Sequence, residues 1–274
     1  MNTLPTITVV TPSYNQAAYL EASLRSVLDQ NYPALRYIVM DGGSTDGSVD
    51  IIRHYADKLT HWVSQPDAGQ SDAILKGFET ASPASGDILT WLNSDDVLLP
   101  GALHTVGKIF ARYPHIHWLT GQPANMDVEG HLRLTSLKVG RFRSLIQRGW
   151  YHGRGLGFIR QEGTFWRRSL WQQVGGLNPA LHYAMDFDLW RRFAAYAQLV
   201  TVDQHLAAFR SQPDQKTSEI DRYYHEAGIA LPAATRILAL PLRALFTWAG
   251  WPLAPRIVNG VAYRIHGEQT PSSA

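Results

Sequence analysis

ITVVTPSYNQAAYLEASLRSVLDQNYPALRYIVMD, residues 7–41, is the stretch that decides the fold. It opens with a short apolar run, which is typical of a buried strand. Leu20, Leu24 and Val27 then recur at helical spacing, so they share one face of a helix. A second apolar run, 35–40, ends the stretch. The order strand, helix, strand predicts a βαβ unit with parallel strands.

The same alternation continues along the first half of the chain. Further helices are predicted around 49–59, 73–81 and 103–110, with strands at 61–64 and 88–92. Repeated βα units predict an α/β fold with a mainly parallel central sheet flanked by helices. Beyond about Gln122 the pattern becomes less regular and glycine-rich, and a helix resumes near Asp186.

Composition excludes several classes of function. The chain has 274 residues, of which 45% are hydrophobic, enough to fill a sizeable core. Its formal net charge is only +2, so we expect no nucleic-acid partner. It contains no cysteine, which excludes disulfides, thiolate nucleophiles and sulfur-ligated zinc. Any metal must therefore be held by oxygen or imidazole.

Neither end of the sequence reads as a targeting or membrane-spanning segment. The N-terminus shows no basic leader and no cleavage site, which favours a cytoplasmic protein. Residues 229–265 are rich in Leu, Ala, Trp and Pro, but Arg236, Arg243 and Arg256 interrupt them. This tail either lies in a membrane interface as a broken amphipathic helix or packs on the domain, and the sequence favours neither.

Polar clusters follow three of the predicted strands, at 11–15, 41–46 and 93–96. In an open parallel sheet, ligands bind outside the carboxyl ends of the strands. We therefore expect the three clusters to meet at one site.

Asp95 and Asp96 are the most informative residues of this set. Carboxylates at the end of a buried strand can hold Mg²⁺ or Mn²⁺ through oxygen while the cation bridges a diphosphate. The sequence Asn-Ser-Asp-Asp is also common in turns, because these side chains form hydrogen bonds with the nearby backbone. We therefore weigh a purely structural role for Asp95 and Asp96 equally.

The segment that begins at Asp41 suggests a nucleotide pocket. Two glycines after Asp41 permit close backbone approach, and the carboxylate can accept hydrogen bonds from a base or ribose. An ordinary strand-to-helix turn capped by Asp46 or Ser44 is the alternative. Neither a dinucleotide-binding glycine motif nor a P-loop is present at a strand–helix junction.

Five segments together give the chain a clear resemblance to the family-two glycosyltransferases, over roughly residues 5–216: TPSYN (11–15), SVLDQ (26–30), DGGSTDGS (41–48), WLNSDD (91–96) and DFDLW (186–190). The resemblance implies a Rossmann-like GT-A fold. It also implies a donor site formed by Thr11, Pro12, Tyr14, Asn15, Asp41, Asn93, Ser94 and Asp95, with Asp95 as the metal ligand. Asn93 stands where the family's D-x-D signature has its first aspartate.

The resemblance places the catalytic base at Asp186, at the start of the late helix. Asp186 and Asp188 lie about 200° apart around a helix axis, so both cannot face one site. Asp188 is then expected to have a structural role at the helix N-terminus. A single carboxylate that deprotonates an acceptor hydroxyl gives one displacement at the anomeric carbon, with inversion.

Residues 161–167 resemble the segment that borders the acceptor cavity in this family. Glu162, Thr164 and Trp166 are therefore acceptor-side candidates, although Trp166 is equally well explained as core. Arg210 and Lys216 are candidates to meet a diphosphate, with solvated surface charge as the more common fate of such residues.

We predict three segments: a nucleotide-sugar-binding part, 1–122; an acceptor-binding and catalytic-base part, 123–216; and a helical C-terminal tail, 217–274. The predicted activity is transfer of one sugar from a UDP- or dTDP-linked donor to a saccharide or lipid-linked acceptor, either in the cytoplasm or at the cytoplasmic face of a membrane. The chain lacks the Q-x-x-R-W motif of processive synthases. A non-catalytic sugar-nucleotide-binding protein and a nucleotidyltransferase are the alternatives.

Overall fold

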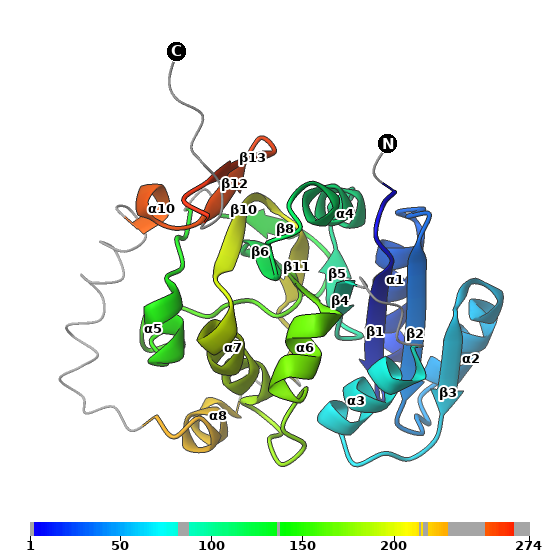
Figure 1. The fold of residues 1–274 in the computed structure, drawn as a ribbon. Coiled ribbons are helices and arrows are strands. Elements are labelled where there is room, and N and C mark those ends of the chain that lie inside the picture. The colour runs from blue at the N-terminus through cyan, green and yellow to red at the C-terminus, as the bar shows by residue number, and fades with distance from the viewer. Residues whose placement is uncertain are drawn as a thin grey trace.

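The computed structural model describes residues 3–81, 88–135, 138–213, 215, 219–229 and 250–265. Within these residues a nine-stranded sheet has the order β13-β12-β10-β6-β9-β4-β1-β2-β3 (Figure 1). Its strands are β1 (Ile7–Ser13), β2 (Leu35–Asp41), β3 (His61–Ser64), β4 (Ile88–Trp91), β6 (Trp118–Gln122), β9 (Thr164–Arg167), β10 (Leu199–His205), β12 (Arg256–Val258) and β13 (Val261–Tyr263).

Most neighbours in this sheet are parallel. β1 pairs in parallel with β2 and β4, β2 with β3, and β10 with β6 and β12. Among the described strands of the sheet, β9 and β13 run antiparallel to their neighbours. The predicted α/β fold with a mainly parallel sheet is confirmed.

A second, four-stranded sheet brings a late part of the chain to an early one. Its order is β5-β11-β7-β8, with β5 (Val97–Leu98), β7 (Ala124–Met126), β8 (Leu132–Leu134) and β11 (Ala207–Arg210). β11 pairs with β5, which follows Asp95 and Asp96 directly, through Ala208 and Val97. Residues after β11 therefore start next to the acidic strand end.

Helices cover both faces of the main sheet, and Figure 1 shows α3, α6 and α7 in front of it and α1 behind it. Leu20, Leu24 and Val27 of α1 are buried, as their spacing predicts. The helices are α1 (Ala17–Leu28), α2 (Ser48–His54), a 3₁₀ turn (Ala56–Lys58), α3 (Gln70–Thr80), α4 (Ala102–Arg112), α5 (Arg143–Gln147), α6 (Arg168–Val174), α7 (Met185–Tyr196), α8 (Ile220–Glu226) and α10 (Gly250–Leu253).

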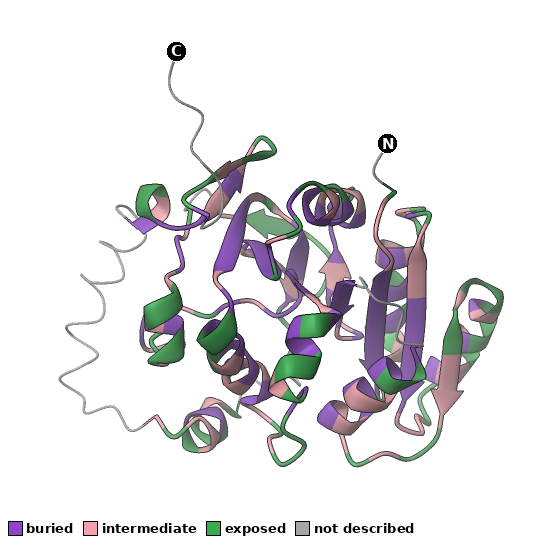
Figure 2. Cartoon of the chain, in the orientation of Figure 1, coloured by how far each residue is buried: buried purple, intermediate pink, exposed green. Residues whose placement is uncertain are grey.

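Each face of the sheet has its own hydrophobic core, because successive strand residues point to opposite faces. Val9 of β1 packs with α1 and α4, whereas Val10 packs with α3 and α7. The second core is built on tryptophan: Trp91 stacks on Trp190 at 6.0 Å between ring centroids, and Trp166 meets Trp91 edge-on at 5.3 Å. Figure 2 shows these central strands buried, with exposed residues on the outer faces of the helices.

The described part of the C-terminal tail differs from the helical tail that the sequence predicts. β12 and β13 form a hairpin that extends the main sheet, with Ile257 buried in the first core. Asn259 and Gly260 at its turn have φ of 50° and 77°, as an Asn-Gly hairpin turn requires. Residues 250–265 therefore pack on the domain, while Arg236 and Arg243 lie outside the described residues. No helix in the described part of the chain is long and apolar enough to span a bilayer.

Candidate active site

The three polar clusters lie together at the carboxyl ends of adjacent parallel strands. Ser13 at the end of β1 is in register with Asp41 at the end of β2, and Val10 is in register with Trp91 of β4. The backbone N–H of Leu92 donates to Val10 O at 2.9 Å, which fixes the start of the acidic turn beside β1.

Tyr14 and Gly42 form an open corner of this site. The Tyr14 side chain is 63% exposed, which leaves its ring face free for a flat ligand. A Cβ on Gly42 would lie 3.0 Å from Asp67 Oδ2 and 3.3 Å from Tyr14 Cδ2, so only glycine leaves this space between the two side chains. Asp67 follows β3, and the sequence analysis did not single it out. Its position at a fourth strand end was the signal available.

Three predicted donor-site residues form hydrogen bonds within the protein that hold the strand ends and the loop after β2: Asp41, Asn15 and Thr11. The buried Asp41 carboxylate accepts hydrogen bonds from the backbone N–H groups of Gly43 and Ser44 and from two serine hydroxyls. Asn15 Oδ1 accepts the N–H of Thr45 at 2.9 Å. The Thr11 hydroxyl bonds the Tyr37 hydroxyl in the core, so its expected donor contact is wrong for the side chain. Pro12 is buried beside them.

Asn93 and Ser94 open the acidic turn, and both are built into it. The Asn93 amide accepts from Gln70 Nε2 at 2.7 Å and donates to Asp96 Oδ2 at 3.2 Å, while Ser94 is buried. Asn93 thus orients Asp96, where the family signature would have a carboxylate. Gln70, on the first turn of α3, is another site residue that the sequence analysis missed.

Asp95 is the partly exposed carboxylate of the turn. Its Oδ2 accepts a hydrogen bond from Gln212 Nε2 at 2.6 Å, and burial raises its pKa although this hydrogen bond opposes the shift. Gln212 reaches it because β11 runs beside β5. Rotation of the Gln212 amide can place either its nitrogen or its oxygen beside the Asp95 carboxylate.

Asp96 and Glu162 are fully enclosed carboxyls next to Asp95. Burial raises the pKa of Asp96 well above its usual value, and the charges of Asp95 and Glu162 add to the rise. Burial also raises the pKa of Glu162, against the lowering effect of Arg160. The sequence analysis missed Arg160, whose Nη2 donates to Asn125 Oδ1 at 3.0 Å.

Asp186 lies in the first turn of α7 and faces the same acidic group. Burial raises its pKa to about 6, the N–H of Phe187 opposes this rise, and the charge of Glu162 adds to it. Its Oδ1 accepts that N–H at 2.7 Å. Asp188 instead accepts two hydrogen bonds from Arg192, at 2.9 and 2.7 Å. The two aspartates of α7 therefore have separate surroundings, as helix geometry predicts.

Arg210 is buried, which makes the expectation of a solvated surface charge wrong. Its guanidinium donates to the backbone oxygens of Asp95, Asp127 and Val128, at 2.9, 3.1 and 3.2 Å. These bonds tie the acidic turn to the β7–β8 turn. The other diphosphate candidate, Lys216, lies outside the described residues.

Two acceptor-side candidates do not line an open surface. Trp166 is fully buried in the tryptophan core, because β9 points it toward α6 and α7. Thr164 is also fully buried, and its hydroxyl bonds Thr120 Oγ1 and Arg160 O. For Trp166 the core alternative therefore holds, and the Thr164 side chain is enclosed rather than open to an acceptor.

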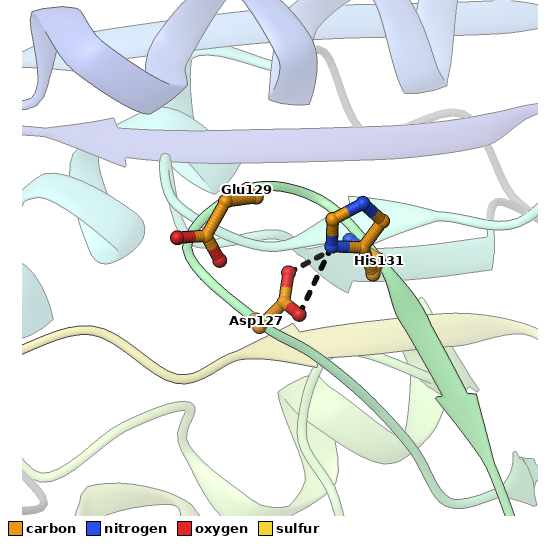
Figure 3. Close-up of side chains that lie close together, drawn as sticks. All are labelled: Asp127, Glu129 and His131. Atoms are coloured by element: carbon orange, nitrogen blue, oxygen red, sulfur yellow. Dashed lines mark hydrogen bonds and ion pairs between the residues drawn. The ribbon is translucent and has the colours of Figure 1, made fainter.

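A second acidic group lies on the β7–β8 turn. Asp127, Glu129 and His131 bring one ligand atom each to within 4.8 Å of the others (Figure 3). Asp127 also accepts the backbone N–H of His131 at 2.8 Å, so turn chemistry accounts for its position. Glu129 and His131 are exposed.

A surface hollow of about 430 Å³ lies between β3 and α3, apart from both acidic groups.

Carboxylates and an open aromatic corner at the carboxyl ends of a mainly parallel sheet define a GT-A-type α/β protein. The family model described as glycosyl transferase family 2 matches residues 8–172, and the chain belongs to this family. Relatives include an uncharacterized glycosyltransferase of Haemophilus influenzae, 32% identical over 53% of this chain and 58% of the relative. The putative teichuronic acid biosynthesis glycosyltransferase TuaG of Bacillus subtilis is 39% identical over 35% of this chain.

The chain spans 38% of the length of TuaG, so these relatives are matched only in part. Solved structures extend the similarity of fold. Staphylococcus aureus TarS 1-349, in complex with UDP-GlcNAc, matches with a TM-score of 0.61 and 16% identity, over 89% of this chain and 73% of TarS. The mannosyltransferase PcManGT from Pyrobaculum calidifontis, in complex with GDP-Man and Mn²⁺, gives a TM-score of 0.59 and 18% identity, over 90% and 75%.

Proposed function

We propose that the chain transfers one sugar from a nucleoside diphosphate sugar to a hydroxyl group of a saccharide acceptor, with inversion. The observation that carries this proposal is a pair of carboxylates in different surroundings at one edge of the sheet. Asp95 is the partly exposed carboxylate of the acidic turn, whereas Asp186, at the start of α7, is buried with its pKa raised to about 6. Carboxyls with such separated roles are typical of acid–base sites.

Asp186 is the general base of the proposed reaction. Its Oδ1 is held by the N–H of Phe187, so Oδ2 accepts the proton of the acceptor hydroxyl. A base with a pKa of about 6 is ionised at neutral pH and still basic enough to assist proton removal. The acceptor oxygen then bonds to the anomeric carbon as the bond to the diphosphate breaks, which inverts that centre.

The residues present fit a divalent cation, Mg²⁺ or Mn²⁺. Four carboxyl groups bring acidic oxygens together, Asp95, Asp96, Glu162 and Asp186, and the charges of Arg160 and Arg210 offset only part of the rise in their pKa values. Oxygen ligands with few protein carboxylates suit Mg²⁺ and Mn²⁺ bound with substrate phosphates. Asp95 would hold the cation, which when bound stabilises the negative charge on the departing diphosphate.

The donor is proposed to be UDP- or dTDP-linked, with its base on the exposed ring of Tyr14. Asp67 lies beside that ring, across the space that Gly42 leaves open, where it can accept hydrogen bonds from a base. The complexes of TarS with UDP-GlcNAc and of PcManGT with GDP-Man and Mn²⁺ support a nucleotide-sugar donor.

A lipid-linked acceptor would bring the chain to the cytoplasmic face of a membrane. Leu253 of α10 is 53% exposed, and Lys138 and Arg256 lie over the ring of the neighbouring Trp251. An apolar side chain beside cations suits an anionic lipid surface. Flotation of the full chain with anionic vesicles, compared with Leu253→Ser, tests this part of the proposal.

Calorimetry with UDP, dTDP and GDP, each with and without Mn²⁺, tests the function as a whole. We expect one nucleotide to bind only with the cation, and its sugar conjugates to release the nucleoside diphosphate in a coupled assay. Metal-dependent binding without turnover of any conjugate would instead identify a non-catalytic sugar-nucleotide-binding protein. Absence of binding in a folded sample would refute both.

A further inference from the structure

Glu162 has an orphaned oxygen in the interior of the site. Its side chain is only 4% exposed, and Oε1 has no hydrogen-bond partner among the described residues. Buried polar atoms are nearly always hydrogen-bonded, and leaving one unpaired is destabilising. An unpaired acidic oxygen at a strand end therefore points to a ligand that completes it.

The turn that carries Glu162 is held firmly in place. Gln161 donates from its side chain to Trp91 O at the end of β4, and the backbone N–H of Thr164 closes the turn on Gln161 O at 3.0 Å. The N–H of Gly121, on β6, donates to Gly163 O at 3.1 Å. These contacts fix Glu162 between two strand ends, so its position does not depend on a mobile loop.

Glu162 interacts with both ends of the proposed reaction centre. Its charge raises the pKa of Asp96, the neighbour of the metal ligand, and it is itself affected by Asp95. Its charge also raises the pKa of Asp186, the proposed base. Glu162 thus lies close to the leaving-group side and to the acceptor side at once.

The group that must lie between those two sides is the transferred sugar. The diphosphate leaves toward Asp95, and the acceptor hydroxyl arrives beside Asp186, so the anomeric carbon and its ring lie between them. Sugar hydroxyls both donate and accept hydrogen bonds, so they can pair with a carboxyl group in either protonation state. Neither the nucleotide base nor the acceptor is required to reach this place.

We propose that Glu162 recognises the transferred sugar by accepting hydrogen bonds from its ring hydroxyls on Oε1, and so decides which sugar the site takes. This inference rests on the proposed function and replaces the sequence-based expectation that Glu162 faces the acceptor. A site built to pair with a hydroxyl discriminates strongly against a sugar that lacks it or holds it in the other configuration, because the buried oxygen is then left unpaired.

The test compares a nucleoside diphosphate with its own sugar conjugates. Calorimetry with Mn²⁺ measures UDP, UDP-glucose, UDP-galactose and UDP-N-acetylglucosamine, or the same series on GDP or dTDP if that nucleotide is the one bound. In Glu162→Ala we expect affinity for the nucleoside diphosphate within about twofold of the unsubstituted chain, while the preferred conjugate binds at least about tenfold more weakly. The preference among conjugates should fall as well. Glu79→Gln, on the exposed last turn of α3, is the matched control.

Glu162→Gln keeps the shape of the side chain and guards against misfolding of the alanine variant. Because burial disfavours the charged form of Glu162, a neutral amide of the same shape should give a melting temperature equal to or above that of the unsubstituted chain, whereas a structural carboxylate would lower it on replacement. Equal losses for the diphosphate and its conjugates would mean that Glu162 holds the cation, and a change confined to the acceptor KM would place it on the acceptor. Either result overturns the inference, while absent binding to the unsubstituted chain refutes the proposed function instead.

Discussion

Asp186 is the residue on which the proposed chemistry depends most directly. Asp186→Asn keeps the shape of the side chain and its place on α7 but cannot accept the proton. We expect kcat to fall by about 100-fold or more, since a positioned general base contributes on the order of 100- to 10,000-fold. Binding of the nucleoside diphosphate with Mn²⁺ should change by less than about twofold. A variant that keeps most of its turnover would show that the base lies elsewhere.

The same substitution should stabilise the fold at neutral pH. The pKa of Asp186 is raised from 3.8 to about 6 by burial, so the folded chain binds this proton more tightly than the unfolded chain. The stabilisation is fully present below pH 3.8 and is lost as pH rises through about 6. At pH 7.5 we expect Asp186→Asn to raise the free energy of unfolding by roughly 2 kcal/mol, and at pH 3.5 by close to zero. Urea unfolding at both pH values measures this, and equal effects at the two would contradict it.

At the scale of elements, α8 packs against the start of α7 through Phe187 and Tyr223, and one α8 side chain, Glu226, also binds the backbone there. The Glu226 carboxylate accepts the backbone N–H groups of His182, Tyr183 and Ala184 at 2.7–3.1 Å, just before the turn that carries Asp186. The first N–H groups of a helix have no partner within the helix, so an acidic group there is stabilising.

Glu226→Gln should therefore weaken this contact by about 1 kcal/mol at pH 7.5. Burial raises the pKa of Glu226, but the N–H donors outweigh it and hold the pKa below 4.5. The stabilisation is present above pH 4.5 and is lost as pH falls through the lowered pKa. Urea unfolding of the variant should differ from that of the unsubstituted chain at pH 7.5, and the difference should shrink progressively as pH falls below 4.5. Glu129→Gln, whose side chain is exposed, should show no difference at either pH.

Helices and strands whose apolar residues recur at a regular spacing were predictable from the sequence. Strands that form only by pairing with residues distant in the sequence were not. The spacing of Leu20, Leu24 and Val27 predicts α1 because it depends on local geometry alone. β12 and β13 have three residues each and gain their stability from β10, so periodicity could not reveal them. Asn259-Gly260 was the available signal for that hairpin.

The site follows the same division. The sequence identifies three of the acidic residues, because each lies at the predicted end of a strand or start of a helix: Asp41, Asp95 and Asp186. Gln212 reaches Asp95 only because β11 lies beside β5, a contact between residues 117 positions apart. Trp166 illustrates a different difficulty. Its segment lies next to the site, but only some side chains of such a segment can face the site, and the Trp166 side chain points from β9 into the core.

For the molecule as a whole, the chain is nearly neutral, with a formal net charge of +2, but four of its carboxyl groups interact at one edge of the sheet: Asp95, Asp96, Glu162 and Asp186. Asp95 and Glu162 raise the pKa of the buried Asp96, which shows that their charges repel within the folded state. A cation that binds there should relieve this repulsion and stabilise the whole fold, because it binds the folded chain and not the unfolded one. Calorimetric scans should show a melting temperature about 3 °C higher at a Mn²⁺ concentration near ten times its Kd, with the increase removed by EDTA.

Two variants decide which acidic group is responsible for that stabilisation. Asp95→Asn removes one charge from the repelling cluster, so its melting temperature in EDTA should be higher than that of the unsubstituted chain, and Mn²⁺ should add little to it. His131→Ala leaves this cluster intact but dismantles the exposed group on the β7–β8 turn, so the full increase with Mn²⁺ should remain. The reverse pattern would locate the cation at Asp127, Glu129 and His131.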